Sequence, residues 1–472
     1  MKQNVTFLLL ITFLFPFTLI AQKQDLDWTK IEEETILHFQ TLLRMNTSDP
    51  PGNEAPAVEY LKSVLEKEGI EVKIFALVPH RPNLVARLKG SGKARPLLLM
   101  GHTDVVSVDS TKWKYPPFSA TRKDGYVYGR GAVDDKDNAV AGLMVMLLLK
   151  RAKLELDRDV IFLAEAGEEG STQYGIGYMV DQHFNEIDAE YCFAEGGGVT
   201  RTGGKIQQAR IATTEKIPNS VRLVARGISG HGSVPLRTNA IVHLSQAIAR
   251  VATWQTPMRL NETTRSFFER LATTSPPEDA ARYKILLTGN NTETAQEYLA
   301  VNVPSLYSTL RTSISPNIIK GGYRSNVIPS EAEATLDIRA LPDENIPQLI
   351  SEMRRVINDT AIEIVSPSRV SRPGAAPSSI NTEAFKVIEA AVKDNYNTIT
   401  LPSMLTGATD MSYLRARGIQ CYGMGPMIDS EDGPKGFGAH SDQERILEES
   451  LYKFVHFQWD IVRNLAVPAK KK

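Results

Sequence analysis

The chain has 472 residues, of which 42% are hydrophobic and 23% are charged, and its formal net charge is −1. This length predicts more than one domain, each large enough to bury its own core. The near-neutral charge, without basic clusters apart from the terminal lysines, argues against binding to nucleic acid or to an anionic membrane surface. The two cysteines, Cys192 and Cys421, are too few for a disulfide framework and are interpreted as buried thiols.

Residues 1–21 are interpreted as a secretory signal peptide. Lys2 gives a basic start, an apolar run extends from Val5 to Ile20, and Ala21 is a small residue at the expected cleavage point. The alternative is a membrane anchor, but Pro16 interrupts the run, whose length is marginal for a spanning helix. We therefore expect an exported protein, periplasmic or secreted, without stable membrane insertion after cleavage.

Apolar strands and amphipathic helices alternate through residues 22–214. This alternation predicts a mostly parallel sheet that is covered by helices on both faces. Helices are expected at 30–43, 57–68 and 138–152, and strands at 71–75, 83–88, 96–100, 127–128, 160–164 and 191–193.

The pattern changes near residue 215. Alternating apolar and polar residues at 220–225 and 331–339 predict two strands with one solvated face, and a helix is expected at 240–254. The polar, proline-broken stretch 256–322 is interpreted as an insertion. These features together indicate a smaller α+β unit.

Past residue 370 the α/β pattern returns. We expect a helix at 382–394, a strand at 420–423 and a final helix at 443–465. The chain is therefore predicted to fold as an α/β catalytic domain, residues 22–214 and 371–472, interrupted by an inserted α+β lid, residues 215–370.

Five segments each offer a residue that binds metals, directly after a strand-like run or a glycine-rich loop. In open α/β sheets ligands bind beyond the carboxyl ends of the strands, so such residues mark the place of a site. Two histidines and three carboxylates match the needs of two zinc ions that share a bridging ligand. The candidates are His102, Asp134, one of the adjacent pair Glu168 and Glu169, Glu195 and His440.

Each of these residue types suits a particular task. Asp104, two residues after His102, is placed to hold the second ring nitrogen of that histidine. Asp134 can bridge two metals about 3.5–4 Å apart with its two oxygens. Of Glu168 and Glu169, one can bind metal while the other accepts a proton from water. Alone, each feature has an ordinary structural explanation, such as a polar pair, a helix cap or an acidic turn; only their combination indicates a hydrolase.

The combination resembles the co-catalytic zinc metallopeptidase family that includes aminoacylase, carboxypeptidase S, glutamate carboxypeptidase, carnosinase and succinyl-diaminopimelate desuccinylase. The resemblance covers roughly residues 30–465 and rests on seven motifs. They are Gly-His-x-Asp, Gly-Arg-Gly-x-x-Asp-Asp-Lys, Glu-Glu-Gly, Glu-Gly-Gly, Gly-His-Gly-Ser, Asn-Val-Ile-Pro and a late histidine.

The resemblance implies a role for each residue of the site. His102 and Glu195 would hold one zinc ion and Glu169 and His440 the other, with Asp134 bridging and a cis peptide bond after it. Glu168 would be the general base, and Asp104 the carboxylate behind His102. Co²⁺ or Mn²⁺ are possible substitutes for Zn²⁺ at such ligands.

The resemblance also implies groups that bind substrate. His231 would stabilise the developing oxyanion from the lid, Asn326 and Arg339 would hold the substrate carbonyl and its free carboxylate, and Gly407 would line the same pocket. Each has an alternative: a loop histidine, a capping asparagine, a strand-edge arginine. The family's lid also implies a possible homodimer, whose geometry the insertion at 256–322 leaves open.

We therefore predict zinc-dependent hydrolysis of an amide or peptide bond next to a free carboxylate, as in a carboxypeptidase or dipeptidase. Glutamate at position 195 resembles the aminoacylase, carboxypeptidase S and desuccinylase branches, whereas carnosinase and glutamate carboxypeptidase have aspartate there. The alternative to a short peptide is therefore an N-acyl amino acid, as in aminoacylase. A third interpretation, a zinc- or peptide-binding protein without catalysis, would be marked by loss of Glu168 or of a ligand, and all are present. A serine hydrolase is disfavoured because no Gly-x-Ser-x-Gly elbow occurs.

Overall fold

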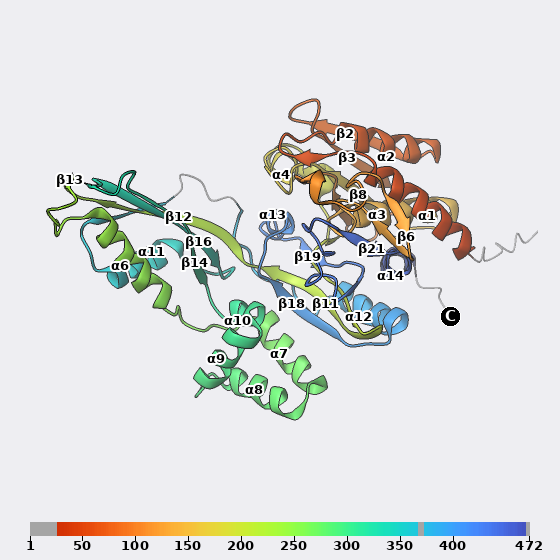
Figure 1. The fold of residues 1–472 in the computed structure, drawn as a ribbon. Coiled ribbons are helices and arrows are strands. Elements are labelled where there is room, and N and C mark those ends of the chain that lie inside the picture. The colour runs from red at the N-terminus through yellow and green to blue at the C-terminus, as the bar shows by residue number, and fades with distance from the viewer. Residues whose placement is uncertain (1–25, 367–371, 469–472) are drawn as a thin grey trace, which may run out of the picture.

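The computed structural model describes residues 26–366 and 372–468. The signal peptide expected at residues 1–21 lies outside the described residues. Figure 1 shows a large body of sheet and helices, an elongated arm that projects from it, and a helical cluster at the corner between the two. Within the described part of the chain, no helix combines the length and the apolar character needed to cross a membrane.

A ten-stranded sheet forms the centre of the large body. Its order is β2-β3-β8-β4-β9-β19-β11-β10-β20, and β18 also pairs with β11. Strands β8, β4, β9 and β19 are parallel neighbours, whereas β2, β3 and β8 pair antiparallel. The strands are β2 (Glu71–Ala76), β3 (Pro82–Leu88), β4 (Leu97–His102), β8 (Val160–Glu165), β9 (Tyr191–Ala194), β10 (Gly198–Thr202), β11 (Lys205–Glu215), β18 (Thr400–Leu405), β19 (Gln420–Gly423) and β20 (Met427–Asp429).

Helices cover both faces of this sheet, as the unbroken apolar strands predict. Side chains alternate along β4, so that Leu97 and Leu99 join one hydrophobic core while Leu98 and Met100 join the other. The first core contains α1 (Trp28–Leu43), α2 (Ala55–Lys67), α3 (Lys136–Arg151), α12 (Glu383–Tyr396) and α14 (Glu448–Ala466). The second contains α4 (Ile176–Gln182), α5 (Phe184–Ile187) and α13 (Met411–Arg415).

Short strands complete the large body, and one of them shows that the predicted start of the final helix was wrong. The final helix begins at Glu448 rather than at 443, because residues 445–447 form a strand that pairs with β7. The short elements are β1 (Ser48–Asp49), β5 (Val105–Val106), a 3-10 turn (Ser110–Lys112), β6 (Thr121–Lys123), β7 (Tyr126–Tyr128) and β21 (Arg445–Leu447).

The arm, which we call the lid, contains a four-stranded antiparallel sheet in the order β14-β16-β12-β17. Helices α6 and α11 share its hydrophobic core, and burial alternates along β16, as predicted for a sheet with one solvated face. The lid elements are β12 (Ile217–Arg226), β13 (Gly230–His231), α6 (Ala240–Thr253), β14 (Ser313–Gly321), β15 (Val327–Ile328), β16 (Glu331–Ala340), α11 (Ile346–Ile357) and β17 (Ile362–Val365).

The stretch 256–322, interpreted above as an insertion, is mostly helical, but its last residues belong to the lid sheet. It contains α7 (Glu262–Thr274), α8 (Pro277–Thr288), α9 (Glu293–Asn302) and α10 (Pro304–Thr309). These helices share their core with Leu401 of β18 and so pack on the large body rather than on the lid sheet. Residues 313–321 are not part of this cluster but form the edge strand β14 of the lid. We call α7–α10 the helical insertion.

Candidate active site

Three neighbouring parallel strands deliver acidic and imidazole side chains to one edge of the large sheet. His102 is the last residue of β4, Glu195 directly follows β9, and Glu168 and Glu169 follow β8 after a short turn. Because β8, β4 and β9 run in the same direction side by side, their carboxyl ends meet at this edge.

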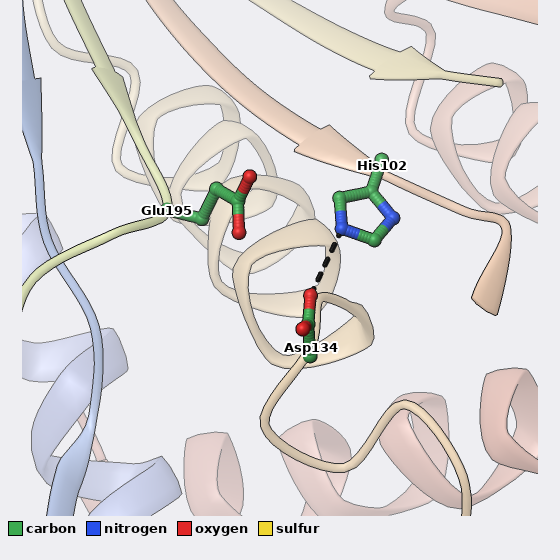
Figure 2. Close-up of side chains that lie close together, drawn as sticks. All are labelled: His102, Asp134 and Glu195. Atoms are coloured by element: carbon green, nitrogen blue, oxygen red, sulfur yellow. Dashed lines mark hydrogen bonds and ion pairs between the residues drawn. The ribbon is translucent and has the colours of Figure 1, made fainter. Parts of the chain in front are cut away.

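Asp134 joins His102 and Glu195 in a first cluster, which Figure 2 shows. One ligand atom from each of the three residues lies within 4.8 Å of the other two. The Nε2 atom of His102 is 3.1 Å from Oδ1 of Asp134, and the carboxylate of Glu195 faces the same space. This set of one imidazole and two carboxylates is one that a divalent transition metal accepts.

Asp134 also belongs to a second cluster, with Glu169 and His440. The Nε2 atom of His440 lies 3.0 Å from Oδ2 of Asp134 and 2.8 Å from Oε1 of Glu169. Ligand atoms of these three residues again lie within 4.8 Å of one another. The two carboxylate oxygens of Asp134 therefore face different histidines, which is the arrangement that a bridging ligand between two metals requires.

The charges of the site fit a pair of cations. Burial raises the pKa of the Glu195 carboxyl well above its ordinary range, and the nearby charges of Glu168 and Asp134 raise it further. The Asp134 and Glu169 carboxylates raise the pKa of His440 to about 10. Buried carboxylates at this density are stable as anions only beside positive charge, so the residues present fit two divalent metal ions.

Glu168 lies next to these clusters and contacts a residue that the sequence analysis missed. Its Oε1 atom accepts a hydrogen bond of 2.6 Å from Nη2 of Arg372, and Nη1 of the same guanidinium pairs with Asp410 at 2.5 Å. Burial raises the pKa of Glu168 to about 8, although Arg372 lowers it. A single buried arginine has no sequence pattern, so no signal pointed to Arg372.

A comparison with family models identifies the chain. Residues 98–464 match the model of peptidase family M20/M25/M40. The chain belongs to this family. Its members hydrolyse peptide and amide bonds with the help of metal ions, so the chain is a metal-dependent hydrolase, as predicted.

Individual relatives agree with this assignment. The chain is 27% identical over 418 residues to "Probable carboxypeptidase S-like 2" of Dictyostelium discoideum, covering 86% of this chain and 78% of the relative. It is 26% identical over 385 residues to the human "N-fatty-acyl-amino acid synthase/hydrolase PM20D1", covering 78% of this chain and 74% of the relative. A solved structure, the M20 family metallo-carboxypeptidase Sso-CP2 from Sulfolobus solfataricus, superposes with a TM-score of 0.67 at 21% identity, covering 91% of this chain and 98% of that one.

Asp104 has a broader structural role than predicted. Its carboxylate accepts hydrogen bonds from the backbone nitrogens of Glu168 and Glu169, at 3.2 and 3.0 Å. Nδ1 of His102 lies 3.0 Å from the carbonyl oxygen of Asp104 and 3.5 Å from its carboxylate. Asp104 thus ties the turn that carries the two glutamates to the strand that carries His102.

The loop that carries Asp134 is held from both sides. The peptide bond between Asp134 and Asp135 is cis, as the resemblance implied. The Asp135 carboxylate accepts a hydrogen bond from the backbone nitrogen of His102 at 3.1 Å. Glu444, four residues after His440, accepts from the Arg130 guanidinium at 2.5 Å and from the Val133 nitrogen at 2.9 Å. Sequence reasoning missed Glu444, which links the Asp134 loop to the segment of the second histidine.

Among the described residues, the predicted substrate residues of the lid, His231, Asn326 and Arg339, form no hydrogen bond or ion pair with the metal-ligand clusters. His231 is exposed in β13, at the far end of the lid in Figure 1, and its Nδ1 lies 2.7 Å from Oγ of Ser233. The Asn326 carbonyl accepts from the Gly232 nitrogen at 2.8 Å, so it lies beside His231. Arg339 in β16 donates to Asp337 at 3.0 Å, and Gly407 lies in the loop after β18 with open space around it.

Proposed function

We propose that this hydrolase is an exported enzyme with two zinc ions that cleaves an amide or peptide bond next to a free carboxylate. The observation that carries the proposal is the shared Asp134, whose two oxygens lie 3.1 and 3.0 Å from the Nε2 atoms of two different histidines. We assign His102 and Glu195 to one metal and Glu169 and His440 to the other. Co²⁺ or Mn²⁺ are alternative ions at these ligands.

Glu168 is the proposed general base. Arg372 occupies one of its oxygens, and the other is free to take a proton from the attacking water. The water oxygen then adds to the carbonyl carbon, and Glu168 returns the proton to the amide nitrogen as the C–N bond breaks. When bound, the metal pair supplies positive charge that polarises the carbonyl and lowers the pKa of water towards about 7.

The lid and one loop of the large body supply the proposed substrate contacts. Asn326 and Arg339 are assigned to the substrate carbonyl and its free carboxylate, and Gly407 to the wall of the pocket. His231 is assigned to the oxyanion, which requires either closure of the lid or a second copy of the chain. We propose a homodimer through the lid, because β14 is an edge strand with Ile318 52% and Ile319 61% exposed.

Two substrate classes fit this chemistry, small peptides with a free carboxyl terminus and N-acyl amino acids. A panel of dipeptides and N-acetyl amino acids, tested on the mature protein, separates them.

We expect about two zinc ions per chain by elemental analysis, loss of activity on chelation and recovery with Zn²⁺ or Co²⁺. An active preparation with no more than one tightly bound ion would contradict the bridged site. Retention of residues 1–20 in a membrane fraction would contradict export.

A further inference from the structure

A cavity lies between the helical insertion and the large sheet, next to the proposed active site. Its volume is about 240 Å³, below the roughly 300–1,000 Å³ of pockets that enclose a whole small ligand. It therefore suits one substituent of a substrate rather than the entire molecule. Its apolar lining comes from both sides, with Phe267 and Leu306 from the insertion and Val199, Met404 and Leu405 from the sheet.

Both segments of the sheet that bound this cavity continue directly into the proposed active site. Gly196, Gly197 and Gly198 form part of its wall, and Gly196 is bonded to Glu195. On the other side the lining ends at Thr406, which is bonded to Gly407. A substituent in this cavity thus lies against the same backbone segments that carry a proposed metal ligand and the proposed pocket loop.

Arg210 is the only charged residue among those that line the cavity. Its guanidinium stacks on the ring of Phe267, with 5.6 Å between Cζ and the ring centroid. With the Gln208 amide oxygen turned towards it, Nε and Nη2 each donate a hydrogen bond of 3.1 Å to that neutral side chain. No carboxylate of residues 26–366 and 372–468 forms an ion pair with Arg210, and burial lowers its pKa.

A half-buried guanidinium without an anion is unusual, because neutral hydrogen bonds and ring stacking offset the loss of hydration less fully than a partner of opposite charge does. Arginine is also the side chain best suited to bind a carboxylate through two parallel hydrogen bonds. The cavity thus combines an apolar wall with an unpaired cation, and a ligand that matches both features has an apolar chain with an anionic end.

We propose that this cavity receives the acyl side of the substrate and that Arg210 selects acyl groups whose apolar chain ends in a carboxylate. This proposal rests on the proposed amide hydrolysis and adds a substrate class to it. It also gives a function to the helical insertion, which supplies Phe267 and Leu306 to the cavity.

The test compares three substrates that share one amino acid and differ in the acyl group: N-acetyl, N-hexanoyl and N-adipyl. Hexanoyl and adipyl groups have equal chain length, so their difference isolates the terminal carboxylate. We expect kcat/KM for the adipyl substrate to exceed that for the hexanoyl substrate by about 10-fold or more, the range of a charged hydrogen bond. Arg210→Met should abolish this preference and leave the acetyl substrate unchanged within about 2-fold.

Two further variants control this result. Ser305→Trp places a large side chain at an exposed position of the cavity lining and should reduce hydrolysis of both six-carbon substrates without affecting the acetyl one. Arg265→Gln removes an exposed arginine from α7, the helix that supplies Phe267, and should leave all three rates unchanged.

The possible results of this experiment distinguish a failure of the cavity proposal from a failure of the proposed function. Hydrolysis of the acetyl substrate without an adipyl preference would overturn the role of the cavity and leave the proposed function intact. Equal loss of activity on all three substrates in Arg210→Met would show a structural role for Arg210 and would also overturn it. No hydrolysis of any N-acyl substrate or peptide by the metal-loaded wild type would overturn both proposals.

Discussion

At the scale of single residues, the site depends on pairs of neighbours with different tasks. Glu168 and Glu169 are adjacent in sequence, yet Glu169 contacts His440 while Glu168 contacts Arg372. Asp104 holds the backbone nitrogens of both, so the turn fixes the two carboxylates in different directions. A base beside a metal site needs this separation, because a carboxylate that binds metal cannot also accept the proton.

Glu168→Gln tests that division of tasks. The amide keeps the shape of the side chain but cannot accept a proton, so we expect kcat to fall by at least roughly 100-fold. The metal content should stay at the wild-type level, because Glu168 is not assigned to either metal. Glu169→Gln is the matched variant and should lower the metal content. If Glu169→Gln kept both ions and lost turnover, the two roles would be exchanged.

Several of the proposed metal ligands were predictable because they follow a rule of chain topology. His102, Glu195 and the Glu168 turn all come directly after buried parallel strands, and such strands end at a common edge. Arg372 and Glu444 were not predictable, because each acts through a contact with a segment more than 200 residues away in sequence. No local pattern encodes such a contact.

At the scale of elements, the helical insertion was the least predictable part of the fold. Its sequence is polar and interrupted by prolines, and its helices are stabilised by packing on β18 rather than by long apolar runs. The strands of the lid were easier to predict, since alternation along β16 directly reflects a sheet with one buried face. Along β12 the alternation is less complete, because Leu223, Val224 and Ala225 are all buried. Residues 313–321 were included in the insertion because they continue the polar, proline-broken stretch 256–322, but they form β14 of the lid.

The insertion also contacts the point where the lid leaves the large body. Lys216 lies between β11 and β12, is fully buried, and donates from Nζ to the Ser308 carbonyl and hydroxyl and to the Ser313 hydroxyl, at 2.9 to 3.0 Å. These acceptors are neutral. Burial, together with the nearby Arg339 charge, lowers the pKa of Lys216 to about 7.

This pKa predicts a dependence of stability on pH. Between about pH 7 and the ordinary lysine pKa of about 10.4, the unfolded chain binds a proton at Lys216 that the folded chain does not, so stability rises with pH in this window. From pH 7 to pH 9 the contribution is about 2 kcal/mol. Lys216→Met should therefore show a smaller rise in the free energy of unfolding than the wild type, measured by urea denaturation at both values. An equal rise in both proteins would show that the pKa of Lys216 is not lowered in the folded chain.

At the scale of the whole molecule, the exposed edge of the lid predicts self-association. Ile318, Ile319 and Tyr323 are 52%, 61% and 83% exposed, and Ile241 of α6 lies against the adjacent Gly321 and Gly322. Ile319→Asp should shift a dimer to monomer in sedimentation experiments, because a charge on an edge strand opposes strand pairing. Ile285→Asp, at an exposed position of the insertion, is the control and should leave the dimer intact. A wild type that stays monomeric at high concentration would rule out this interface.

The position of His231 connects this interface to catalysis. His231 lies at the far end of the lid, exposed, while Glu168 lies at the edge of the large sheet. An oxyanion donor contributes about 100-fold or more to kcat, so His231→Ala should lower kcat by at least that factor with unchanged metal content. A variant with near-normal kcat would remove His231 from the mechanism.

Mixing two inactive variants identifies which chain supplies His231. A dimer of one His231→Ala chain and one Glu168→Gln chain contains one intact Glu168 and one intact His231 on different chains. If the histidine acts across the dimer, the mixture should recover activity in one of its two sites, whereas each variant alone stays inactive. The Ile319→Asp substitution, added to both chains, should then abolish the recovery because it removes the dimer. No recovery despite demonstrated exchange of subunits would assign His231 to the site of its own chain, reached by closure of the lid about the segment at Lys216.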